Sequence, residues 1–108
     1  MKFILLLVTS LFVGSAFAQA NLVKECQAKK WGSCFEAALA SQKAGKNEEA
    51  VKLLEVACTN THEASCHMLG LMWSSDKTDA EKAQKGKAAL QKACSMKYKP
   101  ACEDLQKL

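Results

Sequence analysis

The chain has 108 residues, of which 49% are hydrophobic and 6% aromatic, with a formal net charge of +4 at pH 7. All 15 basic residues are lysines, scattered among the acidic residues. Because arginine supplies the planar fork that reads phosphates and base edges, its absence argues against specific nucleic-acid binding, and the length fits one small domain.

Residues 1–18 have the three parts of a secretory signal peptide. Lys2 precedes an apolar stretch from Phe3 to Val13, and small residues then end in Ala16-Phe17-Ala18. The apolar stretch is too short to span a bilayer comfortably, and no second run of about 20 apolar residues follows it. We therefore predict cleavage after residue 18 and a mature chain that is periplasmic or secreted, not an integral membrane protein.

Six cysteines lie in the mature part of the chain, and they form three pairs with identical spacing. The pairs, each eight residues apart, begin 32 and then 36 residues after one another: Cys26 and Cys34, Cys58 and Cys66, Cys94 and Cys102. An even number of cysteines behind a signal peptide predicts disulfides formed in an oxidising compartment. A period of this length is typical of helix-pair repeats.

The first unit reads as a leading helix over 21–30 and a helix pair. Ser33 and Glu36 have the spacing of a capping box, which predicts the start of an Ala-rich helix that ends at Lys43. Asn47 can cap the next helix, in which Ala50, Val51, Leu54 and Ala57 form one apolar stripe.

The second unit repeats this pattern. Asn60 or Thr61 can start a helix over 63–73, and the box from Thr78 to Glu81 predicts a helix that runs to about Met96. Pro100 suits the first turn of a short closing helix.

These elements predict an all-α fold, a short solenoid of α/α helix-pair repeats with about six helices and no sheet. We assign residues 19–108 to one repeat domain, with units of about 21–58 and 59–94 and a capping helix over 95–108.

Geometry selects the pairing of the cysteines. Residues eight apart in one unbroken helix are separated by roughly 12 Å, whereas disulfide-linked Cα atoms lie about 4.4–6.8 Å apart. A bridge within each pair therefore requires the chain to reverse between its cysteines. Residues 59–61 and 97–100 can supply such a reversal, as can Gly32 in the first unit. We expect each bridge to join the last turn of one helix to the first turn of the next.

The residues from Ala64-Ser-Cys-His-Met-Leu-Gly70-Leu-Met-Trp73 through Lys82-Ala83 to Lys92-Ala93-Cys94 resemble Sel-one-like repeats. The Cys-x7-Cys spacing is similar to that of the Helicobacter cysteine-rich protein family. The resemblance implies a tetratricopeptide-like scaffold that binds proteins or peptides on a concave face. It also implies an alternative, since some cysteine-rich members are associated with penicillin binding and β-lactamase activity.

Ser74-Ser-Asp-Lys77 matches the Ser-x-x-Lys signature of serine β-lactamases, which makes Ser74 and Lys77 the only catalytic candidates. The match falls at a predicted helix end, and neither Ser-Asp-Asn nor Lys-Thr-Gly is present. We therefore assign no catalytic residue and expect no cofactor.

His62 and His67 superficially resemble a zinc-protease motif, but they are five residues apart where that motif requires four. Zinc would also compete with disulfide formation for the thiolates. We interpret both histidines as structural or surface residues and predict no metal site.

Trp31, Trp73, Met68, Met72 and Leu69 are interpreted as core or inter-helix filling. Aligning Ala38 and Gly70 with the small-residue position of similar helix-pair repeats places eight residues on the concave face: Phe35, Leu39, Gln42, Lys43, His67, Leu71, Ser74 and Ser75. The sequence thus predicts an exported scaffold for a protein or peptide partner. The alternatives are a β-lactamase-like hydrolase and a structural or metal-binding protein, and the oligomeric state stays open.

Overall fold

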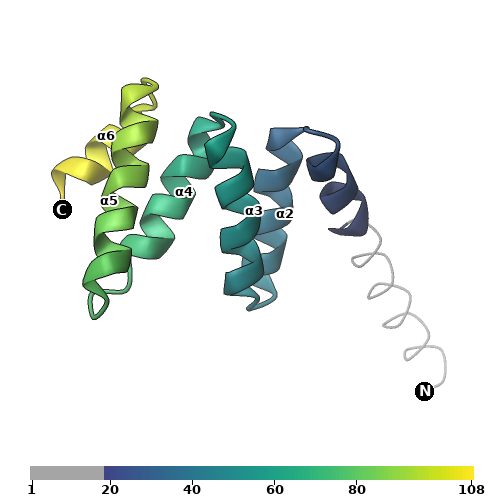
Figure 1. Ribbon diagram of the computed structural model, residues 1–108, viewed down its shortest axis with the longest axis horizontal. Helices are drawn as coiled ribbons and strands as arrows, with labels where there is room; N and C mark the ends of the chain where they lie inside the picture. Colours follow the sequence, from purple (N-terminus) through teal and green to yellow (C-terminus); the bar gives the residue numbers. More distant parts are fainter. Residues whose placement is uncertain (1–18) are drawn as a thin grey trace, which may run out of the picture.

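The computed structural model describes residues 19–108, which are helical throughout apart from short connections (Figure 1). A helix over residues 19–27 is followed by α2 (Trp31–Lys43), α3 (Asn47–Thr59), α4 (Glu63–Ser74), α5 (Ala80–Ser95) and α6 (Lys99–Gln106). None of the described helices is long and apolar enough to cross a membrane. The predicted signal peptide, residues 1–18, lies outside the described part of the chain.

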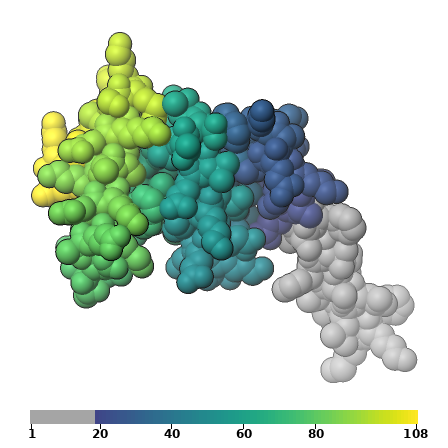
Figure 2. Space-filling view, in the orientation of Figure 1, coloured from purple at the N-terminus to yellow at the C-terminus, as the bar shows by residue number. Residues whose placement is uncertain are grey.

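Successive helices lie side by side and run in alternating directions, so that the chain forms a zigzag array (Figure 1). The predicted all-α, disulfide-stapled helical repeat is confirmed. Leu54 and Leu90, the largest fully buried side chains, occupy equivalent positions in α3 and α5, and alanines fill much of the remaining core. Figure 2 shows α3, in teal, and α5, in green, on the same face of the array.

The three disulfides pair as the spacing predicts, with Cα–Cα distances of 4.5, 4.6 and 4.7 Å. Each bridge joins the last turn of one helix to the first turn of the next, because its second cysteine is the fourth residue of α2, α4 or α6. All three junctions lie along the same edge of the array, at the top of Figure 1. The helices are therefore fastened at one edge only.

A left-handed residue reverses the chain at every junction. Lys29, Thr61 and Lys97 have φ angles of 70°, 65° and 66°, and each is the third residue after the first cysteine of its pair. The amide of the following residue then donates to the carbonyl five residues back, at 3.0–3.1 Å, as in a Schellman motif. The prediction that Gly32 reverses the chain is wrong, because that residue lies in the first turn of α2.

The predicted helix starts need correction by one or two residues. Helix α2 begins at Trp31, and Ser33 donates its hydroxyl proton to Glu25 Oε2 at 2.6 Å instead of capping the helix. Asn47 is the first residue of α3 and not its cap. Asp79, not Thr78, caps α5 by accepting from the Lys82 amide at 3.1 Å. Capping-box spacing therefore places these helix starts only to within one or two residues.

Two glycines bring α4 and α5 into backbone contact. A Cβ atom on Gly70 would lie 2.7 Å from Leu90 Cγ, and one on Gly86 would lie 2.8 Å from both the Gly70 oxygen and the Ser74 nitrogen. Because backbone atoms cannot rotate away as a side chain can, only glycine fits at residue 86.

We predict that Gly86→Ala lowers the free energy of unfolding by about 2–3 kcal/mol, because the added methyl group forces α4 and α5 apart. Gly32→Ala is the matched control, since it lies in a helix and nothing lies within 4 Å of its Cβ position. The control should raise stability by about 0.5–1 kcal/mol. Urea unfolding of the oxidised protein, followed by circular dichroism, measures both; equal effects would contradict the close approach.

We predict that Lys97→Gly stabilises the protein by about 0.5–1 kcal/mol, because glycine adopts a positive φ without the steric cost that a side chain incurs. Lys87→Gly, in the exposed middle of α5, should instead destabilise it by about 1 kcal/mol. The same unfolding assay compares them, and a loss of stability in both variants would show that the reversal imposes no strain.

Candidate functional site

A groove opens between α3 and α4. The two helices lie closest at the Cys58–Cys66 bridge and diverge toward the opposite edge of the array (Figure 1). The groove has a volume of about 750 Å³, a size typical of ligand sites. Its lining comes mainly from α3, α4 and the loop that follows α4: Gln42, Asn47, Glu48, Val51, Lys52, Glu55, Met68, Leu71, Met72, Trp73, Ser75, Asp76 and Lys82.

The apolar part of the groove consists of one α3 residue, Val51, and four α4 residues. Met68, Met72 and Trp73 are half-buried and pack against the core, while Leu71 is 37% exposed. Methionine side chains are unbranched and polarizable, so they adapt to differently shaped partners. Leu71 exposes an apolar surface that nothing in the described chain covers.

The rim of the groove is polar and charged. Glu48, Lys52 and Glu55 project from α3, and Asp76 stands on the other side, where Lys82 approaches it at 4.0 Å. The hydroxyl and the amide of Thr78 donate to Asp76 Oδ1 at 2.6 and 3.1 Å. These two hydrogen bonds lower the pKa of the Asp76 carboxyl below its ordinary value, because they stabilise the carboxylate.

Only three of the eight residues predicted for the concave face line this groove: Gln42, Leu71 and Ser75. Phe35 and Leu39 are half-buried, and the Phe35 ring lies 5.8 Å from that of His62. Lys43 is exposed at the end of α2, outside the groove. The other five predicted residues lie outside the lining of this groove.

His67 faces α6 instead of a free surface. Its Nε2 atom lies 2.6 Å from Asp104 Oδ2, and its ring lies 5.4 Å from the ring of Tyr98. Both partners belong to the closing segment of the chain. Helix α6 thus covers the part of the inner face that His67 was predicted to provide.

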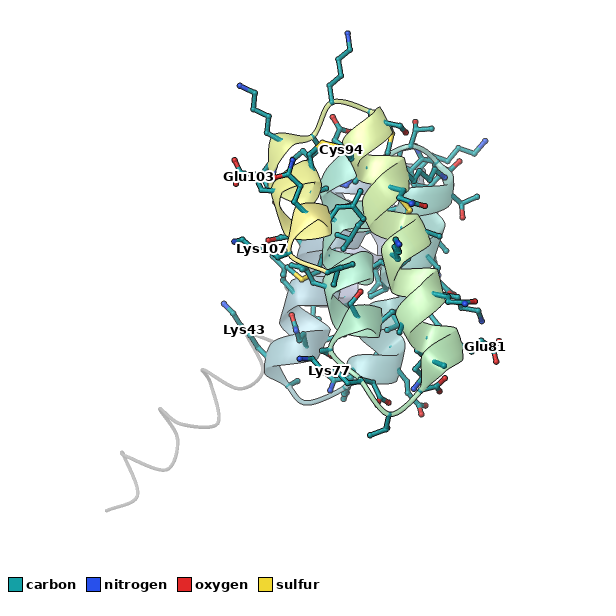
Figure 3. The ribbon with its side chains drawn as sticks, turned by 90° about the vertical axis from the view of Figure 1, so that its left-hand side faces the viewer. Lys43, Lys77, Glu81, Cys94, Glu103 and Lys107 are labelled. Carbon is teal, nitrogen blue, oxygen red and sulfur yellow. A yellow bond between two sulfur atoms is a disulfide. The ribbon has the colours of Figure 1, made fainter. Side chains whose placement is uncertain are left out.

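The two catalytic candidates do not form a reactive pair. Ser74 Oγ is buried at the contact with Gly86 and has no hydrogen-bond partner, so neither a base nor a substrate reaches it. Ser74 was predicted to lie on the concave face, and its hydroxyl does not reach a free surface. Lys77 is exposed on the loop after α4, at the edge opposite Cys94 (Figure 3).

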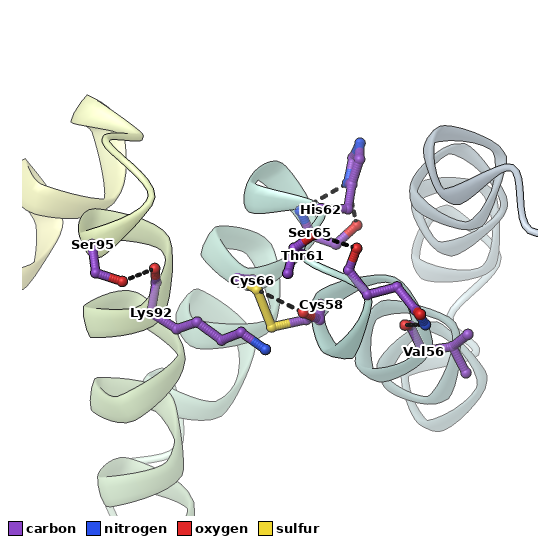
Figure 4. The surroundings of a disulfide bond; sticks show 9 residues. Val56, Cys58, Thr61, His62, Ser65, Cys66, Lys92 and Ser95 are labelled. Carbon is purple, nitrogen blue, oxygen red and sulfur yellow. Dashed lines mark hydrogen bonds between the residues drawn. A yellow bond between two sulfur atoms is a disulfide. The ribbon is translucent and has the colours of Figure 1, made fainter.

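His62 caps α4, so the prediction that Asn60 or Thr61 starts this helix is wrong. Its Nδ1 atom accepts from the Ser65 amide at 3.3 Å and lies 2.7 Å from the Ser65 hydroxyl (Figure 4). All the cysteines are bridged. Within residues 19–108, no three His, Cys, Asp or Glu side chains are grouped so that they could hold a metal ion.

The sequence interpretation missed the groove side chains of α4. Met68, Met72 and Trp73 were assigned to the core, and they do contact it, yet all three also line the groove. The signal in the sequence was the pair of methionines one turn apart, next to an exposed leucine. A partly buried residue can serve both the core and a binding surface, and spacing alone does not separate the two.

Comparisons with protein-family models, with curated proteins and with solved structures gave no match for this chain. The interpretation of the groove therefore depends on its own geometry.

We predict that Asp104→Ala loosens α6, because it removes the hydrogen bond to His67 that ties α6 to α4. A charge-assisted bond in this half-buried setting contributes about 1–2 kcal/mol. The free energy of local opening of α6 should fall by a similar amount, so its amide hydrogens exchange faster. Glu103→Ala, an exposed neighbour on α6 (Figure 3), is the control. Hydrogen exchange measured by mass spectrometry tests this prediction. Equal protection of α6 in the two variants would contradict the role of the bond between His67 and Asp104.

Proposed function

We propose that the protein is an exported scaffold that binds an extended or helical peptide segment of a partner protein in the groove between α3 and α4. The observation that carries this proposal is the groove's composition. It combines a methionine-rich apolar floor with a charged rim, the arrangement by which helical proteins accept apolar anchors of a partner.

The exposure of Leu71 supports binding in particular. A protein this small gains stability by covering large apolar side chains, and yet Leu71 stays 37% exposed beside two half-buried methionines. An apolar partner side chain placed there would bury Leu71 and the two methionines together. Export is supported by the three disulfides, which persist in an oxidising compartment. We further propose the periplasm or the extracellular space as that compartment.

The chain's relationship to Sel-one-like repeats and to the Helicobacter cysteine-rich proteins also remains a proposal. The confirmed Cys-x7-Cys pairing and the helix pairs support it. We favour the scaffold over the β-lactamase-like hydrolase, because the only serine with a Ser-x-x-Lys spacing has its hydroxyl buried at the helix contact.

The test is a selection of peptides from a displayed random library on the mature, oxidised protein. In a Trp31→Phe background, Trp73 is the only tryptophan and reports directly from the groove. We predict that selected peptides shift the Trp73 fluorescence. Leu71→Asp should weaken their binding at least about tenfold, since it places a charge where an apolar anchor docks.

Leu108→Asp is the matched control, because Leu108 is also an exposed leucine but lies at the C-terminus, outside the groove. It should leave peptide affinity unchanged. If the selected peptides bind without moving the Trp73 signal, or if both variants bind equally well, the groove is not the binding site.

A further inference from the structure

A second surface lies on the face formed by α3 and α5, the face toward the viewer in Figure 2. The exposed stripes of these two helices occupy equivalent positions, because the repeat places each α5 residue 36 residues after its α3 counterpart. Six exposed positions along α3 correspond in this way to six exposed positions along α5: residues 48, 49, 52, 55, 56 and 59 to residues 84, 85, 88, 91, 92 and 95.

The two stripes carry opposite charge. The α3 stripe contains three glutamates and one lysine, for a net charge of −2: Glu48, Glu49, Glu55 and Lys52. The equivalent α5 positions contain two lysines and no acid, for a net charge of +2: Lys85 and Lys92. Helix α5 as a whole is basic, with four lysines against Glu81. One repeat therefore presents an acidic helix and the next a basic one on the same face.

A shallow hollow separates the two stripes. Its acidic wall is Glu55 of α3, its basic wall is Lys85 and Lys92 of α5, and its floor includes Leu69 and Trp73. The α5 side of the hollow also includes the small side chain of Ala88. The hollow has a volume of about 510 Å³, which offers space for side chains from another molecule.

We propose that this face binds a second copy of the chain in a two-fold symmetric dimer. Helices α3 and α5 run in the same direction (Figure 1). A two-fold axis that runs parallel to both helices, in front of this face and midway between them, places α3 of each copy opposite α5 of the other. Residues at the same position along the axis then meet, so Glu49 of each copy faces Lys85 of the other copy.

The exposure of Val56, an apolar side chain, favours a protein partner over solvent on this face. Val56 is 46% exposed near the C-terminal end of the acidic stripe, and it is one of few large apolar side chains of the described residues that are left exposed. Its equivalent in α5 is Lys92, whose methylene stem can cover the valine of the partner copy while its ammonium group reaches a glutamate. The same face thus offers charge complementarity and an apolar contact to itself.

The dimer face includes Glu48, Lys52 and Glu55, which also form part of the rim of the groove, whereas the apolar floor of the groove comes mainly from α4. The dimer proposal rests on the charge pattern of α3 and α5 and not on peptide binding in the groove. Either proposal can therefore fail while the other holds.

The test measures the mass of the mature, oxidised protein by analytical ultracentrifugation at low and high salt. Since the contact is largely electrostatic, the dimer should form at about 20 mM salt, and its dissociation constant should rise at least about tenfold at about 500 mM salt. Two variants then separate the helices: Lys85→Glu with Lys92→Glu makes the α5 stripe acidic, and Glu49→Lys with Glu55→Lys makes the α3 stripe basic.

Each variant alone should be monomeric, because both of its stripes carry the same sign. An equimolar mixture should dimerise again, since every acidic stripe of one variant then meets a basic stripe of the other. Glu103→Lys on α6, combined with Lys107→Glu directly after it, changes residues away from this face and should dimerise like the unchanged protein (Figure 3). A monomeric unchanged protein at low salt, dimers of either variant alone, or a mixture that stays monomeric would each overturn the proposal, and circular dichroism confirms that the variants are folded.

Discussion

The disulfide-clamped helix reversal is the constraint on which the rest of this structure depends. Each of the three junctions joins cysteines eight residues apart across a left-handed residue and a Schellman-type hydrogen bond. On the loop-entropy account, closing so short a loop contributes about 2.5 kcal/mol. That contribution matters here because the buried core consists largely of alanine and cysteine, with few large side chains, and small domains with little apolar burial need covalent support.

Because the clamps all lie along one edge, the contacts at the other edge decide how far neighbouring helices separate. Gly70 and Gly86 let α4 and α5 approach until their backbones touch. No glycine pair joins α3 to α4, which diverge from their clamp at Cys58 and Cys66 and leave the groove between them. The groove is therefore a product of uneven helix contacts on an evenly clamped chain. Its floor includes two unbranched methionines, Met68 and Met72, which can adapt to differently shaped partners.

The arrangement gives a very small protein two surfaces of different character. The groove has an apolar floor and suits the anchors of a partner segment, whereas the face of α3 and α5 is charged, with opposite signs on equivalent positions. Repetition underlies the charged face, since a repeat that alternates in charge is complementary to itself under a two-fold axis. The clamps hold the helices along one edge, where Cys58 borders the hollow of that face.

The cysteine spacing by itself determined the pairing, the helix reversals and the helical repeat, because a disulfide has a fixed reach and a helix a fixed rise. The capping motifs placed helix starts only to within one or two residues, and Gly32 was misread because the reversal uses Lys29, whose positive φ no composition rule marks. Tertiary structure alone decided which apolar residues of α4 face a groove. It also buried Ser74 against α5 and paired His67 with Asp104, 37 residues away. Spacing along a helix gives the direction of a side chain, but only the packing of neighbouring helices determines what that side chain meets.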